Sequence, residues 1–195
     1  MLSFKRFIAE AKEVHGHVAF LGAAPNTHMG HIKDIIKNMG PGKKFIGLSG
    51  KSTVFSDEER ADIANKQSGG EAETKVEKTA GQTVGRAYNN KVTHLHLHFG
   101  IDRKPMAERL KSSIEAGKIP EMGGGQFKEV HLHYPEDENR SHGLSGTKMR
   151  KAANEGDIET YHKHVGSVFS RPEAVKMMKR TKASIDSGET PLIRK

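Results

Sequence analysis

HVAFLGAAPNTHMGHIKDII, residues 17–36, is the stretch that decides the fold. Its apolar run 18–21 ends at Gly22, which predicts a buried strand closed by a tight turn. After the turn, apolar side chains recur with helical spacing from Ile32 to Ile36. A strand, a glycine turn and a helix direct backbone N–H groups and the positive end of a helix dipole at one point, which suits a phosphate.

Two imidazoles stand where the expected helix begins. His28 and His31 are three positions apart, with Gly30 between them. Both rings can therefore donate hydrogen bonds to the same anion. We expect Gly22, Gly30 and the two histidines to form one nucleotide-binding turn.

Composition sets the outer bounds. With 195 residues, of which 34% are hydrophobic, the chain can bury one core, and we expect one main domain at 14–169. Residues 1–13 read as an amphipathic helix, and 170–195 as a basic helix and tail. Cysteine is absent, which excludes disulfides and thiolate sites. The formal charge of +8 fits anionic ligands, nucleotides or nucleic acid alike.

The remaining patterns predict an α/β fold. Strands are expected at 43–49, 91–99 and 129–134, and helices after Ser56, at 105–116 and after Pro172. Residues 67–78 read as a loop or a weakly supported helix, and 187–195 as a frayed end. No apolar run approaches the roughly 20 residues that span a bilayer, so we expect a soluble protein without a membrane partner. The expected architecture is a Rossmann-like, doubly wound parallel sheet of about five strands with helices on both faces.

Histidines alternate along two of these strands. His94, His96 and His98 share one face of the first strand, and His131 and His133 share one face of the second. Because no carboxylate completes a recognisable ligand spacing, we favour polar strand faces that meet helices or water over a metal site. Gly50-Lys51-Ser52 is not predicted to be a P-loop, because Phe45 stands where that loop requires glycine.

A second anion-binding stretch lies at 142–153, HGLSGTKMRKAA. Ser145 or Thr147 can cap a helix that starts here, while Gly146 and the hydroxyls face an anion. Lys148 adds charge, and the guanidinium of Arg150 can hold a phosphate with two hydrogen bonds. Asp102 and Arg103 follow a strand directly, where parallel sheets bind ligands, and they suit a sugar hydroxyl and a phosphate.

Three of these motifs, in this order, resemble the signatures of the nucleotidyltransferase superfamily. His28-Met29-Gly30-His31 resembles the first signature, and residues 144–150, LSGTKMR, resemble the second, an Ile-Ser-Ser/Gly-Thr-x-x-Arg pattern. Residues 100–103, GIDR, are similar to the intervening Gly-x-Asp-Arg element. The loop departs from the family at Ala24, usually a larger or aromatic residue, and at Pro25, where the proline normally falls one position later.

The resemblance implies transfer of a nucleotidyl group from a nucleoside triphosphate, bound with Mg²⁺, to a phosphate acceptor. His28 and His31 would hold the α- and β-phosphates, Asp102 would touch the nucleoside, and Arg103 is a further candidate. The residues that would bind the β- and γ-phosphates at the start of the second helix are Ser145, Gly146, Thr147, Lys148 and Arg150. The Ser-Gly-Thr form resembles nicotinamide-mononucleotide adenylyltransferases, which favours ATP and that mononucleotide. Cytidylyl transfer, other acceptors, or a non-catalytic nucleotide- or DNA-binding virion protein stay open.

The first residues carry a weaker resemblance. Ile8-Ala9-Glu10 followed by Ala11 is similar to the head-targeting leader of proteins packaged into large tailed phages. This resemblance implies a phage-encoded protein that acts in the host cytoplasm or the virion. The sequence leaves open whether the protein forms a homo-oligomer.

Overall fold

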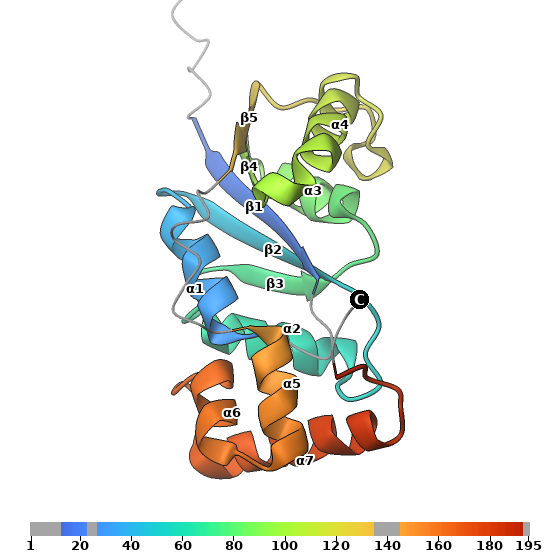
Figure 1. Ribbon diagram of the computed structural model, residues 1–195. Coiled ribbons are helices and arrows are strands. Elements are labelled where there is room, and N and C mark those ends of the chain that lie inside the picture. The colour runs from blue at the N-terminus through green and yellow to red at the C-terminus, as the bar shows by residue number, and fades with distance from the viewer. Residues whose placement is uncertain (1–12, 23–26, 135–144, 193–195) are drawn as a thin grey trace, which may run out of the picture.

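The computed structural model describes residues 13–22, 27–134 and 145–192 (Figure 1). The expected helix at 1–13, the loop residues Ala24 and Pro25, and Leu144 of the second signature fall almost entirely outside these ranges. Five strands form one parallel sheet in the order β3-β2-β1-β4-β5. The strands are β1 (His15–Gly22), β2 (Lys43–Ser49), β3 (Glu73–Val76), β4 (His94–His98) and β5 (Glu129–His133).

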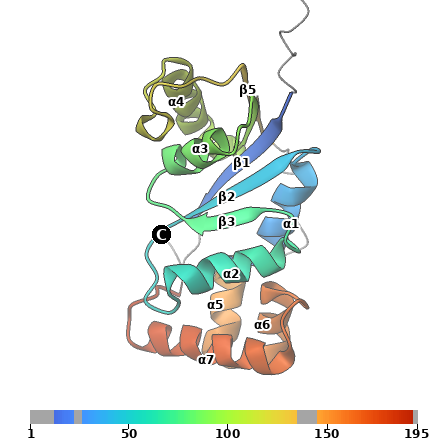
Figure 2. The ribbon, with the colours of Figure 1, turned by 180° about the vertical axis from the view of Figure 1, so that it is seen from behind.

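Helices flank the sheet on both faces, so the predicted Rossmann-like α/β fold is confirmed. They are α1 (Met29–Asn38), α2 (Asp57–Gln67), α3 (Ala80–Asn89), α4 (Lys104–Glu115), α5 (Gly146–Glu155), α6 (Ile158–Val165) and α7 (Arg171–Asp186), with 3₁₀ turns η2 (Ile101–Arg103) and η3 (Pro120–Met122). Figures 1 and 2 show α3 and α4 on one side of the sheet, α1 and α2 on the other, and α5, α6 and α7 stacked beyond α2.

Alternation along the strands builds two cores. On one face, Val18, Leu95 and Leu97 pack with the helix residues Val84 and Ile114. The opposite face holds a second cluster, whose members include Ala19, Leu21, Ile32, Ile46, Leu48 and Ala64. This second core contains residues of β1, β2 and β3 but none of β4 or β5. On this side of the sheet, β4 and β5 carry histidines in place of apolar side chains.

A third core joins α2 to the three C-terminal helices. Ile63, Met149, Tyr161 and Met177 are all buried in it. The helix starts follow the expected capping chemistry, because Ser56 forms a capping box with Glu59, and Ser170 forms one with Glu173. In this third core, α5 packs against α6 and α7 rather than against the sheet.

Two expectations are wrong. Residues 73–76 form an edge strand rather than a loop or helix, because β3 pairs with β2 from Phe45↔Glu73 to Leu48↔Val76. Its polar residues fit an edge position, and Arg86 bridges Glu73 and Glu77 beside it. The segment after Ser187 is not frayed as far as Leu192, because Thr190 is buried and its backbone N–H donates to the Ser184 carbonyl (3.0 Å).

Within the described ranges, no helix combines the length and the apolar character needed to cross a bilayer.

Candidate functional site

The two histidines of the first stretch lie at the start of α1, as predicted. His28 is the N-cap residue, and its Nδ1 accepts a hydrogen bond from the backbone N–H of His31 (3.2 Å). The two rings stack with centroids 5.5 Å apart. Gly30 is buried within the first turn, so the helix can approach its neighbours closely there.

A buried amide ties this helix start to the end of α6. The Nε2 of Gln67 donates to the carbonyls of Thr27 (3.2 Å) and Val165 (2.9 Å). Thr27 precedes His28, and Val165 follows His164, so one side chain from α2 brings both segments together. Consistent with this proximity, the pKa of His28 is lowered to about 4 by burial, then by the charges of His31 and His164.

The second predicted stretch opens α5. Ser145 is the N-cap, and its hydroxyl accepts from the backbone N–H of Lys148 (3.1 Å). Arg150 is 4% exposed, and its Nη2 donates to the Thr147 hydroxyl (3.2 Å). A Cβ on Gly146 would lie 3.2 Å from the Arg150 Nη1, so this glycine leaves room beside the guanidinium.

The helix starts of α1 and α5 are linked through α6. Burial lowers the pKa of His164, and the charge of Lys148 acts in the same direction. His164 therefore lies within electrostatic reach of both His28 and Lys148. The structure thus relates the first histidine motif to the first turn of α5 through α6, which packs against both helices.

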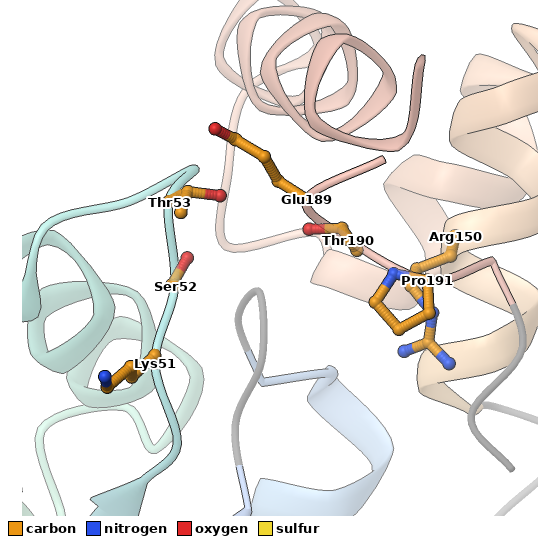
Figure 3. Close-up of a pocket in the computed structure, with 7 residues that line it drawn as sticks. All are labelled: Lys51, Ser52, Thr53, Arg150, Glu189, Thr190 and Pro191. Carbon is orange, nitrogen blue, oxygen red and sulfur yellow. The ribbon is translucent and has the colours of Figure 1, made fainter. Parts of the chain in front are cut away.

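Arg150 lines a cavity of about 160 Å³. Figure 3 shows the loop after β2 on one side of this cavity, and Arg150 with the C-terminal segment on the other. The full lining comprises Lys51, Ser52, Thr53, Arg150, Glu189, Thr190 and Pro191. Two cations and three hydroxyls around one small space suit an anionic ligand, while the carboxylate of Glu189 on the same wall as Thr190 opposes one.

Buried polar contacts fix the cavity walls. The guanidinium of Arg60, which is fully buried, donates to the carbonyls of Gly50 (2.7 Å) and Ser49 (3.0 Å) and so holds the loop after β2. The Ser184 hydroxyl bonds to the hydroxyls of Thr53 (3.2 Å) and Thr190 (2.8 Å). The Nε of Arg150 donates to the Leu192 carbonyl (3.2 Å). The C-terminal segment is therefore a wall of the cavity that contains Arg150.

The remaining predicted residues lie at the ends of strands. Gly22 is the last residue of β1 and pairs with Ser49, so it stands at the sheet's carboxyl edge beside the loop that carries Lys51. Asp102 and Arg103 form the exposed turn η2 after β4. They reach the same edge from the other side of β1, but they do not line the cavity of Arg150.

The histidine-rich strands are neighbours in the sheet and share one polar face with a third strand, because His15 and His17 of β1 join the five predicted histidines. This face is partly open to water, since His131 is half-exposed and His133 is exposed. Neighbouring rings stack or tilt with centroids 4.7–5.3 Å apart. We call these seven residues the histidine face.

Hydrogen bonds across the histidine face fix which nitrogens carry protons. The Nε2 of His17 donates to the Pro41 carbonyl (3.2 Å), so a neutral His17 has a bare Nδ1. That Nδ1 lies 3.0 Å from the Nε2 of His98, which must donate. The Nδ1 of His98 is then a bare, buried nitrogen, and among the described residues it has no hydrogen-bond partner. In the same part of the chain, no group of three or more histidines and carboxylates is arranged to hold a metal ion.

Sequence reasoning missed several residues of the site. Lys51 and Ser52 do not match the P-loop pattern. Their position after a strand, at the carboxyl edge of the sheet, is nevertheless a signal for ligand binding. His164 and Thr190 carry no local signal, because only the packing of α6 and α7 brings them to the site.

The comparisons with known proteins are negative: no protein-family model matches the chain, and no curated protein matches its sequence.

Proposed function

We propose that this chain is a nucleotidyltransferase that moves an adenylyl group from ATP to a phosphate acceptor such as nicotinamide mononucleotide and releases pyrophosphate. The observation that carries the proposal is the link between two distant segments. Gln67 bonds to Thr27, beside the His28–His31 turn, and to Val165 at the end of α6. Helix α6 packs in turn against α5, whose first turns carry Ser145, Lys148 and Arg150.

The chemistry needs no protein nucleophile. A phosphate oxygen of the acceptor attacks the α-phosphorus of the nucleotide as the bond to the bridging oxygen of pyrophosphate breaks. His28 and His31 would donate to the α- and β-phosphates and stabilise the negative charge that develops there. Arg150, with Thr147 beside it, would bind the terminal phosphates, and Mg²⁺ enters with the nucleotide as part of the substrate.

The cavity extends this set of phosphate ligands. Lys51 stands on the wall opposite Arg150, and its ammonium points away from Arg150 in this structure (Figure 3). The side chain is exposed, so a rotamer change would bring the ammonium toward the same anion. Of the predicted residues, Arg150 lines this cavity, whereas Asp102, His28 and His31 do not.

One assay tests the proposal. Purified protein is given MgATP or MgCTP with nicotinamide mononucleotide, other phosphate acceptors or none, and pyrophosphate is measured. We expect release that depends on both substrates and is fastest with ATP and nicotinamide mononucleotide. Faster release with CTP would assign the cytidylyl alternative. Binding of ATP without release from any pair would contradict the enzyme and support a non-catalytic nucleotide-binding protein.

A further inference from the structure

His164 is a buried histidine whose ring is held from one side only. It lies in the last turn of α6 and is 3% exposed. Its Nδ1 is 2.7 Å from the Thr160 carbonyl, which can only accept, so Nδ1 carries the proton of the neutral ring. The Nε2 of a neutral His164 is therefore a bare lone pair.

That nitrogen is buried, and no hydrogen-bond partner for it exists among the described residues. A buried polar atom without a partner costs roughly 1–3 kcal/mol, so proteins seldom keep one unless it serves a ligand or a water. By contrast, His162 on the same helix bonds to the Phe169 carbonyl (2.7 Å). The difference singles out His164 among the imidazoles of α6.

The charged and titratable neighbours of His164 come from three helices. Gln67 bonds to the carbonyls of Thr27 and Val165, which places His164 near the start of α1, and the charge of His164 lowers the pKa of His28 there. Lys148 of α5 acts on His164, as do Lys163 and Asp157 of its own segment. Burial and the two lysines lower the pKa of His164, while the Thr160 carbonyl and Asp157 raise it. The ring is thus neutral near pH 7 in the free protein. Its place in the last turn of α6 nevertheless favours a cation, because a helix dipole is negative there.

We propose that His164 is a third phosphate-binding imidazole of the site and takes up a proton at Nε2 when the polyphosphate of the nucleotide binds. A bare lone pair cannot bond to a fully ionised phosphate, which only accepts, so the added proton turns Nε2 into a donor. The negative charge of the ligand offsets the positive charges of Lys148 and Lys163 near this ring. This inference rests on the proposed function, because it assigns the same site.

The test uses inorganic tripolyphosphate and the full chain. Titration calorimetry at pH 7 in two buffers of different ionisation enthalpy gives both affinity and the number of protons taken up. For the wild-type protein we expect binding with net proton uptake. In His164→Gln we expect affinity to fall about tenfold and uptake to fall by a substantial part of one proton. His162→Gln is the matched control on the same helix and should behave as wild type.

A second measurement covers the case in which His164→Gln does not fold. In the wild-type protein, the ring signal of His164 in a histidine NMR spectrum should move to its protonated position when tripolyphosphate is added at pH 7. An unchanged neutral ring would overturn the inference, as would equal uptake in wild type and His164→Gln. If tripolyphosphate does not bind wild type at all, the proposed function fails with it. If His164→Gln binds tripolyphosphate with wild-type affinity and wild-type proton uptake, the role of His164 is contradicted and the proposed function stands.

Discussion

The ring of His28 is stacked on that of His31, and its Nδ1 accepts the His31 backbone N–H at 3.2 Å. This cap fixes the tautomer, because a neutral His28 must then carry its proton on Nε2. The pKa of about 4 keeps the ring neutral near pH 7 in the free protein. His28 is thus an oriented N–H donor at the positive end of α1, before any ligand arrives.

Replacing His31 tests the catalytic role of this pair. In His31→Ala we expect turnover in the pyrophosphate assay to fall on the order of a hundredfold or more, because a donor to the developing charge is lost. The fold should persist, since a half-buried residue in the first turn of α1 is not part of the core. Circular dichroism and the melting temperature check this. Lys33→Ala, exposed on the same helix, is the control, and near-full turnover in His31→Ala would contradict the assignment.

Lys51 tests the cavity. In Lys51→Gln we expect the KM for MgATP to rise about tenfold with a smaller change in kcat, because a charge that binds phosphate is lost from an exposed wall. Steady-state kinetics at fixed acceptor concentration measure this. Lys176→Gln, an exposed lysine of α7, removes the same charge elsewhere and should leave the KM unchanged. Equal values for both variants would show that Lys51 does not face the nucleotide.

Two glycines that follow helices give a matched pair for stability. Gly166 has φ +104°, and a Cβ there would overlap the side chain of Met29, next to His28. Gly156 has φ +75° and nothing within 4 Å of the same position. We expect Gly156→Ala to cost about 1 kcal/mol of unfolding free energy from backbone strain alone. Gly166→Ala should cost at least about 2 kcal/mol more, through the clash and because φ +104° with ψ +151° is a conformation that essentially only glycine adopts. Urea unfolding measures both costs, and equal ones would show that α6 does not pack against α1 this closely.

The histidine face predicts that stability falls in mild acid. Burial, followed by the charges of neighbouring histidines, lowers the pKa of His96 to about 4 and that of His98 to about 3. Below pH 6.5 the unfolded chain therefore binds more protons than the folded one. The stabilisation is complete above pH 6.5 and is lost as the pH falls toward these values.

Urea unfolding at pH 7, 6 and 5 measures this loss above the titration range of most carboxylates. We expect the free energy of unfolding to fall by at least about 1 kcal/mol per pH unit between pH 6 and 5. In His98→Gln, whose amide can still donate to His17, the pH dependence should weaken. His162→Gln should retain it. Equal stability at pH 7 and pH 5 would contradict the buried neutral state of these rings.

Local patterns in the sequence were sufficient for most elements. The spacing of apolar residues located β1, β2, β4 and β5, and cap residues such as Ser56 and Ser145 located helix starts, because these signals act between residues close in the chain. β3 was not predicted, because three polar residues followed by a single valine on a sheet edge lack an apolar period. The histidine face was only partly anticipated, since alternation shows which residues share a face but not which strands are neighbours.

What the sequence by itself determined is the fold class and the starts of two helices that we expect to bind anions, each of which is a local arrangement of a turn, a cap and a helix. Only the tertiary structure decided which segments meet. It placed His164 between His28 and Lys148, and Lys51 across the cavity from Arg150. The physical reason is that burial of the apolar faces of α5, α6 and α7 against α2 fixes these relations, and such packing joins residues far apart in the chain.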